Sequence, residues 1–239
     1  VLEKNEWKVI RKVSDEGKAK NWWSVGDTKS VTINGKVGAT TISSLKVDAF
    51  IIGFNHNSGK EGSNRIHFLL GKISGKFVGL VDSSYGSTTS TSGAFTMNTS
   101  NTNSGGWGSS QMRSKVLGSA SSPTSPTANT LMAALPSDLR AVMKSCTKYT
   151  DNNGGGNTAS NVSSTTDYLF LLSEYEVFAT HQYCNDAEPN YQAQYDYFKA
   201  GNSKVANKHS ATGTAAVWWL RSPTCSSLGY FCAVSSSGS

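Results

Sequence analysis

The sequence predicts an α+β fold in which antiparallel strands and short helices are joined by much irregular loop. Three observations favour this class. Apolar residues alternate with period two over Leu45–Phe54 and over residues 65–70, as in half-buried strands. Helical periodicity is confined to short stretches on either side of them. The chain of 239 residues, 37% hydrophobic and 16% charged, is long enough to bury a core but rich in polar loop.

A short amphipathic helix is expected at residues 4–16. Apolar side chains recur there at intervals of three, which places them on one helix face. Gly17 follows where such a helix should end, since glycine adopts the left-handed conformation of a helix terminus. The residues that define this face are Trp7, Ile10 and Val13.

An antiparallel meander is expected to follow this helix. Asn34-Gly35 lies between the alternating apolar residues of 31–37, and this dipeptide is the strongest short-range signal for a hairpin turn. The strands at 45–54 and 65–70 continue the alternation, and residues 73–81 extend it across Ser74-Gly75. We therefore expect a sheet in which each strand pairs with the next.

Residues 83–137 contain no acidic side chain, and Ser, Thr, Gly and Asn dominate them up to Trp107. Such a stretch buries too little apolar surface to fold alone. We expect residues 83–130 or so to form a long excursion lying on a single domain of residues 1–239. Its expected docking points are Gly105-Gly106-Trp107 and Met112-Arg113.

The region after the excursion is expected to contain further helices and a buried strand. Spacings of i, i+3, i+4 and i+7 behind Pro136 predict one helix face, formed by Leu139, Val142, Met143 and Cys146. Residues 167–172 are expected to form a buried strand. A capping box at Ser173–Glu176 should open a short helix, and residues 189–199 should form another.

Composition and motif content weigh against several function classes. The net charge of +6 is spread without a basic run, so no nucleic-acid partner is expected. No apolar run approaches the length of a membrane span, so no membrane insertion is expected. The four histidines form no ligand-type pair, and neither a nucleophile elbow nor a phosphate loop is present. We therefore expect no catalytic residue, metal site or cofactor.

The four cysteines, Cys146, Cys184, Cys225 and Cys232, show no CxxC spacing. Small buried hydrophobic thiols are the simplest interpretation. Disulfides joining Cys225 to Cys232 or Cys146 to Cys184 are the alternative.

The densest apolar segment, residues 217–220, contains two adjacent tryptophans and should anchor a core, with one indole under a ligand site as the alternative. Arg221 comes directly after this segment, so its guanidinium is expected near the core with carboxylate or carbonyl partners. Small, mostly uncharged residues then continue to Ser239. A rigid base carrying such a tip predicts a binding surface that can change side chains without changing fold.

Seven motifs, taken in order, resemble one family of gut-bacterial and prophage proteins whose members include variable proteins of diversity-generating retroelements. They are Trp23-Ser-Val-Gly-Asp27, Ile52-Gly-Phe-Asn-His56, Glu61-Gly-x-Asn-Arg-Ile-His-Phe68, Gly105-Gly-Trp-x-x-Ser-x-Met-Arg113, Leu135-Pro-x-Asp-Leu-Arg140, Trp218-Trp-Leu-Arg-Ser-Pro223 and Phe231-Cys-x-Val234. Each motif alone is weak, but seven in register span nearly the whole chain.

This resemblance implies a C-type-lectin-like fold, related to that of formylglycine-generating enzymes, on a virion surface or an extracellular cell surface. The implied partner is a host cell-surface protein or glycan. The implied variable ligand surface is Thr224, Cys225, Ser226, Ser227, Leu228, Gly229, Tyr230, Ala233, Ser235, Ser236 and Ser237. The implied scaffold is Trp218, Trp219, Arg221, Phe231, Cys232, Val234 and Gly238.

Members of this family usually continue through a second variable stretch to a closing strand. The natural polypeptide is therefore expected to be longer by roughly two dozen residues, enough for a strand of ~5–6 residues and its loop. Two alternatives to a non-enzymatic binding protein stay open. One is a copper-dependent oxidase of the formylglycine-generating kind that uses Cys225 and Cys232. The other is an architectural part of a virion or surface layer, in contact with neighbouring subunits.

Overall fold

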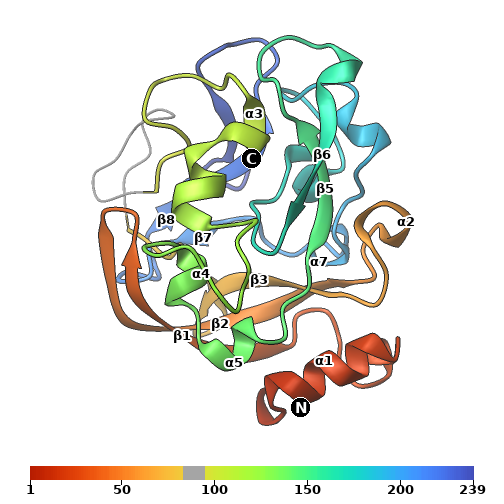
Figure 1. Ribbon diagram of the computed structural model, residues 1–239, viewed down its shortest axis with the longest axis vertical. Coiled ribbons are helices and arrows are strands. Elements are labelled where there is room, and N and C mark those ends of the chain that lie inside the picture. The colour runs from red at the N-terminus through yellow and green to blue at the C-terminus, as the bar shows by residue number, and fades with distance from the viewer. Residues whose placement is uncertain (83–94) are drawn as a thin grey trace.

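The computed structural model describes residues 1–82 and 95–239, and its architecture is α+β with antiparallel sheets and short helices. Figure 1 shows helix α1 at one end of the molecule, beneath the strands β1–β3, with β5, β6 and α3 on the other side of that sheet. Within the described residues, no helix is long and apolar enough to span a bilayer.

The N-terminal helix forms as predicted. A short turn, η1 (Leu2–Lys4), precedes α1 (Trp7–Asp15), and the chain leaves the helix through Gly17 at φ +70°. Trp7 and Ile10 are buried against the sheet. The Trp7 indole meets the Phe68 ring edge to face at 5.5 Å between centroids, so this face fixes α1 to the sheet.

The predicted meander is confirmed as a four-stranded antiparallel sheet in the order β1-β2-β3-β4. Its strands are β1 (Thr28–Val37), β2 (Thr40–Phe54), β3 (Ile66–Ile73) and β4 (Lys76–Phe77). Ser74 and Gly75, both at positive φ, form the last turn as expected. The strand predicted over 73–81 is shorter than expected, because β4 ends at Phe77.

The prediction of a turn at Asn34-Gly35 is wrong, because β1 continues through it and turns only after Val37. The β1–β2 register shifts between Ile33 and Gly35, which marks a bulge. The Asn34 side chain accepts the Ser44 backbone N–H at 3.0 Å. Val37 is fully buried, and this burial requires the strand to continue past the bulge.

Two antiparallel pairs dominate the second half of the chain. β5 (Cys146–Asp151) pairs with β6 (Val162–Asp167), and β9 (Trp218–Pro223) pairs with β10 (Phe231–Val234). A third, two-residue pair joins β7 (Ala206–Asn207) and β8 (Ala215–Ala216). The short helices are α2 (Ser58–Glu61), α3 (Gly106–Ser109), α4 (Leu131–Ala134), α5 (Ser137–Arg140), α6 (Glu174–Phe178) and α7 (Asp196–Lys199). Single 3₁₀ turns are η2 (Ala19–Asn21), η4 (Ala159–Asn161) and η5 (Glu188–Asn190), and η3 (Met112–Leu117) is a short π-helix.

Three predicted elements are wrong. The helix expected behind Pro136 is the single turn α5, after which the chain extends into β5. Residues 168–172 form no strand, because β6 ends at Asp167. The helix expected at 189–199 is split between η5 and α7, since tertiary bonds hold the chain between them: Gln192 Nε2 donates to Tyr149 O, and Tyr195 N–H donates to Glu176 O. The capping box at Ser173 and Glu176 is confirmed.

The excursion is held at the points that the sequence indicated, although residues 83–94 of it lie outside the described residues. Trp107 is fully buried, and its Nε1 donates to Asp167 Oδ2 at 3.0 Å. Arg113 Nε donates to the other oxygen of Asp167 at 2.8 Å. Gly106 lies so close to β5 that a Cβ there would be 2.0 Å from Asp151 O. The excursion therefore joins the core through one buried carboxylate.

Replacing Trp107 by phenylalanine tests this attachment. The ring volume is largely kept, but the donor to buried Asp167 is lost, so we expect the free energy of unfolding to fall by about 1–3 kcal/mol in denaturant melts. Trp22→Phe is the matched control, because Trp22 is 66% exposed and should change stability by at most ~0.5 kcal/mol. Equal losses of stability in the two variants would contradict the attachment of the excursion through the Trp107–Asp167 bond.

Candidate functional site

The connection between β9 and β10, Thr224–Tyr230, is the display loop, and its backbone is held by one buried side chain. Asn103 is fully buried, and its Nδ2 lies 3.0, 2.7 and 2.9 Å from the carbonyl oxygens of Thr224, Ser227 and Tyr230. The Asn103 backbone N–H donates to Leu228 O at 2.9 Å. The path of the loop is thus fixed through its carbonyls.

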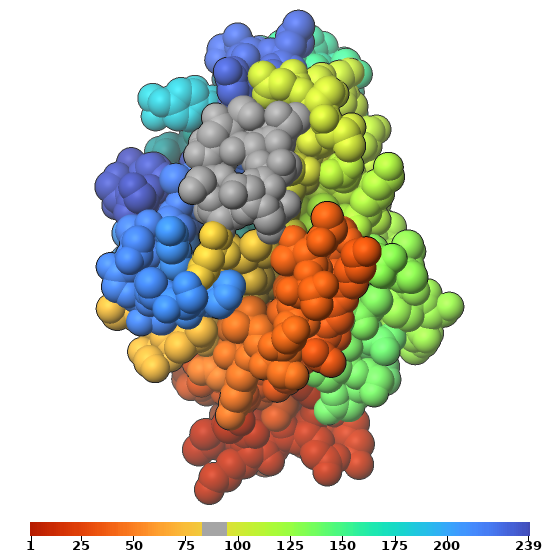
Figure 2. All heavy atoms as spheres, turned by 90° about the vertical axis from the view of Figure 1, so that its left-hand side faces the viewer, coloured from red at the N-terminus to blue at the C-terminus, as the bar shows by residue number. Residues whose placement is uncertain are grey.

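The side chains of the display loop face outward. Leu228 is 72% exposed and Tyr230 is 43% exposed. Figure 2 shows dark-blue residues of the C-terminal part at the top of the molecule, beside yellow-green residues of the excursion and opposite α1. Neighbouring segments complete the surface: Gly155 leaves room for the Leu228 side chain, and Cys225 N–H donates to the carbonyl of exposed Tyr183.

The other residues of the implied ligand surface have different neighbours. Ala233 is half-buried in β10, opposite Trp219. Ser235, Ser236 and Ser237 follow β10, where Gly238 packs against Val205. The structure therefore brings Thr224–Tyr230 together as one loop, while residues 235–237 lie beside a separate segment.

The residues implied as scaffold are largely interior. Arg221, Phe231, Cys232 and Val234 are buried. Trp218 and Trp219 are only half-buried, and both line a cavity of about 260 Å³. Trp218 Nε1 donates to Lys204 O at 2.9 Å. The tryptophan pair thus lies between core and cavity.

All four cysteines are free thiols, so the disulfide alternative is wrong. Cys146, Cys184 and Cys232 are buried, as the simpler interpretation predicted. Burial raises the pKa of Cys232 well above its ordinary value, and burial together with Asp186 raises the pKa of Cys225. Both effects disfavour the thiolate form that binds metals.

A network of four buried charges, Glu61, Lys148, Glu176 and Arg221, lies behind the display-loop strands. Arg221 meets Glu176 with two bonds, Nη1 to Oε2 at 2.5 Å and Nη2 to Oε1 at 3.0 Å. Lys148 Nζ lies 2.5 Å from Glu176 Oε1 and 2.8 Å from Glu61 Oε2. Each of these side chains is at most 2% exposed. We call this set the charge network.

Two cations and two carboxylates balance the charge network. Burial opposes the charge of Glu176, but Arg221 and Lys148 hold the pKa of that carboxyl far below its usual range. Burial likewise opposes the charge of Lys148, but Glu176 and Glu61 raise the pKa of its ammonium. The network is stable only as a set, because removing one member leaves an uncompensated charge in the interior.

Two histidines that lie apart in sequence meet beside this network. His56 stacks on the Tyr195 ring at 3.6 Å between centroids, and the His67 ring lies 5.6 Å from His56. Burial lowers the pKa of His56 to about 3 and that of His67 well below its ordinary value. The Nε2 atoms of both rings have no hydrogen-bond partner within the described chain.

Metal-ligand atoms also come together here. One set is Glu61, His67 and Cys146, and another is His56, Glu61 and Glu176, with the atoms of each set within 4.8 Å of one another. Lys148 already bonds both carboxylates, however, so they are neutralised by a side chain of the protein itself. The sequence prediction of isolated histidines missed this cluster, although His56, Glu61 and His67 all fall within motifs that carry the family resemblance.

Residues 88–239, more than half of the chain, match the family described as domain of unknown function (DUF6273). The chain belongs to the DUF6273 family. No curated protein and no solved structure matches it. In this DUF6273 protein, the charge network joins Lys148, Glu176 and Arg221 of the matched region to Glu61 outside it. Helix α2, between β2 and β3, therefore supplies one of the two carboxylates that balance the network.

Arg221→Lys should lower the free energy of unfolding by about 1–3 kcal/mol, because a lysine cannot reproduce two parallel bonds to Glu176. Chemical denaturation measures this change. Arg11→Lys is the control: Arg11 pairs with Asp15 and donates to Val142 O, with 35% of its side chain exposed, so its replacement should change stability by less than about 1 kcal/mol and by less than Arg221→Lys does. Full stability of the Arg221→Lys variant would show that Arg221 has another role.

The two histidines predict acid sensitivity. Each binds its proton more weakly in the folded chain than in the unfolded one, so stability should fall as pH drops below about 6.5, the ordinary histidine pKa. His56→Asn keeps a donor and removes one titrating group. Between pH 6 and pH 4 it should reduce the slope of unfolding free energy by about 1.4 kcal/mol per pH unit. An unchanged slope would contradict the neutral state assigned to His56.

Proposed function

We infer that this DUF6273 protein is a non-enzymatic ligand-binding domain whose display loop meets a partner at the surface of a virion or a bacterial cell. The observation that carries the proposal is the attachment of the loop through Asn103. Backbone carbonyls accept those bonds whatever side chains the loop bears. Within the loop, only the Thr224 hydroxyl is seen to reach the same carbonyls, those of Ser227 and Tyr230. A loop held in this way can vary its other outward residues without losing its shape, which is the property that a variable binding surface requires.

The surroundings of the loop support the same function. Before it, Arg221 is fixed by Glu176; after it, Phe231, Cys232 and Val234 are buried. Exposed Tyr230 and Tyr183 are side chains of the kind that contribute most at interfaces, where large, stiff groups bind with little loss of conformational entropy, and exposed Leu228 adds apolar area. A host cell-surface protein or glycan is the proposed partner, with neighbouring virion subunits as further contacts.

The finer fold assignment belongs to this proposal. A helix at the N-terminal end, an antiparallel sheet and a long irregular region carrying a two-stranded tip support a C-type-lectin-like arrangement. The oxidase alternative receives less support, because the raised pKa values of Cys225 and Cys232 oppose copper binding by thiolates.

The direct test separates stability from binding. The display-loop variant replaces Ser226, Ser227 and Tyr230 of the loop, together with Ser235 after β10, by alanine. We expect it to abolish binding to a glycan array or to host-cell extracts, while the free energy of unfolding changes by about 1 kcal/mol or less. The control variant carries alanine at three exposed positions away from the loop, Ser63, Ser210 and Trp22. A loss of several kcal/mol in the loop variant would place these side chains in the core.

Asn103→Leu should lower stability, unlike the replacement of the outward side chains. Leucine is close to asparagine in shape but leaves the carbonyls of Thr224, Ser227 and Tyr230 without their common donor, so the free energy of unfolding should fall by about 1–3 kcal/mol. Proteolysis of the loop should also accelerate. If Asn103→Leu changed neither the free energy of unfolding nor the rate of proteolysis, the loop would be held by its own side chains and the proposal would lose its main support.

A further inference from the structure

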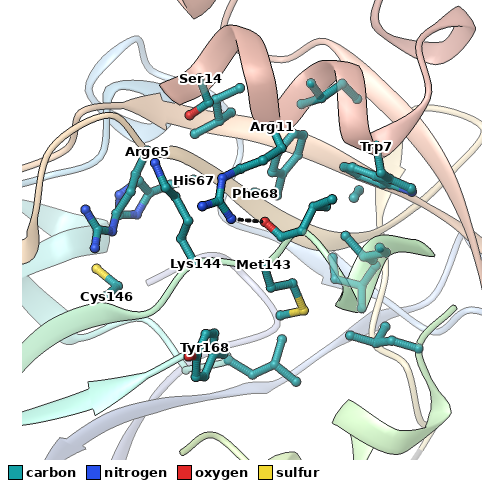
Figure 3. Close-up of a pocket in the computed structure, with 18 of the residues that line it drawn as sticks. Trp7, Arg11, Ser14, Arg65, His67, Phe68, Met143, Lys144, Cys146 and Tyr168 are labelled. Atoms are coloured by element: carbon teal, nitrogen blue, oxygen red, sulfur yellow. Dashed lines mark hydrogen bonds between the residues drawn. The ribbon is translucent and has the colours of Figure 1, made fainter. Parts of the chain in front are cut away.

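A cavity of about 180 Å³ lies at the opposite end of the molecule from the display loop. Figure 3 shows it between α1, β3 and the residues around Met143 and Tyr168, with Arg65, His67, Lys144 and Cys146 on one side and Trp7 on the other. Most of the lining is apolar, including Ile10, Phe68, Val142, Met143, Leu169 and Phe170. Phe68, Val142, Met143 and Phe170 are only half-buried although they lie inside the fold.

His67 stands in the wall of the cavity and is tied to the interior. It is 5% exposed and lines the cavity. Its Nδ1 lies 2.9 Å from the Tyr195 hydroxyl, which in turn accepts from Lys148 Nζ at 3.2 Å. An ammonium can only donate, so the Tyr195 proton goes to His67 Nδ1 and the proton of the neutral imidazole resides on Nε2. That N–H has no acceptor among the described residues and almost no accessible surface, so it is enclosed behind the wall and does not bond a ligand in the cavity.

The rim of the cavity carries an excess of positive charge. Arg11 and Lys144 share one carboxylate, Asp15. Arg65 lacks a carboxylate partner within the described chain: its Nε donates to Ser145 O and its Nη1 to Ser63 O. The side chains of Arg11 and Lys144 are 35% and 22% exposed, so this rim reaches solvent. Three cations against one carboxylate favour an anionic ligand.

We propose that this cavity binds a small aromatic carboxylate. Its volume is close to the ~150 Å³ of an apolar cavity known to hold benzene, so one aromatic ring fits. Trp7, Phe68 and Phe170 provide aromatic walls for that ring. The carboxylate meets the positive rim, where Arg65 donates only to backbone carbonyls and has no carboxylate partner within the described chain. This site shares no residue with the display loop, so neither proposal depends on the other.

Calorimetric titration of the full chain with benzoate, phenylacetate and cyclohexanecarboxylate, with benzamide as the neutral isostere, tests the proposal. We expect saturable binding of the aromatic carboxylates, with benzamide at least tenfold weaker because it brings no charge to the rim. Chemical shifts of the Trp7 indole and the His67 ring in nuclear magnetic resonance spectra locate the bound probe. The display-loop variant should bind benzoate like the wild type.

Substitutions make the test specific. Arg65→Met should weaken benzoate binding about ten- to a hundredfold, as expected for loss of a charged hydrogen bond. Arg140→Met is the matched control, because Arg140 also donates to backbone carbonyls, those of Leu135 and Pro123, but does not line the cavity. Leu139→Trp should block the cavity and abolish binding, and circular dichroism melts confirm that each variant folds.

Three results would overturn the proposal. The first is no saturable binding of any aromatic carboxylate up to about 10 mM, well above the dissociation constant of a specific small-ligand site (~1 mM or less). The second is equal affinity for benzamide and benzoate, and the third is ligand-induced chemical-shift changes confined to residues away from Trp7 and His67. Tight binding to a folded Leu139→Trp variant would equally place the probe elsewhere.

Discussion

The bidentate pair of Arg221 and Glu176 is the interaction on which the rest of the structure depends. Arg221 is on β9, directly before the display loop, and Glu176 is on α6, in the capping box that begins that helix. Lys148 of β5 and Glu61 of α2 extend the pair to four charges, so four distant segments meet at one balanced point. Because a charge buried without its partner costs about 3–5 kcal/mol, these segments are held in one relative arrangement.

The sequence predicts those parts of the structure that depend on residues close together in the chain. The helix at Trp7–Asp15, the meander and the Ser173–Glu176 capping box each follow from spacing or from one short motif. Arg221 was expected near the core because it follows an apolar run, but nothing local names Glu176 as its partner. The antiparallel pairing of β2 with β3 brings His56 and His67 close, but nothing local names Tyr195, far along the chain, which stacks on His56 and bonds His67. Such pairings arise from tertiary packing, which periodicity does not encode.

In the display loop, too, nearby residues explain one property and distant residues another. None of its own residues is charged, and all except Leu228 and Tyr230 are small, so they give the loop little apolar surface to bury. Its shape comes from Asn103, more than a hundred residues earlier, and from the close approach of Gly154 to the Asn103 carbonyl, where a Cβ would be 1.8 Å away. In the sequence, nothing distinguishes Asn103 from the other polar residues of the Ser/Thr/Asn-rich excursion. The excursion thus supplies the support for the loop as well as its own attachment through Trp107.

The wrong predictions around Pro136 and Asp167 have one physical cause. Leu139, Val142 and Met143 carry helical spacing, and residues 168–172 read as a buried strand, yet both segments are irregular. Their apolar side chains line the cavity beside α1, and residues 168–172 also line the cavity beside Trp218 and Trp219. An apolar pattern records that side chains avoid water and does not record whether they pack against each other or around a space. Walls built from irregular segments can therefore enclose a volume that a continuous helix face or strand would have filled.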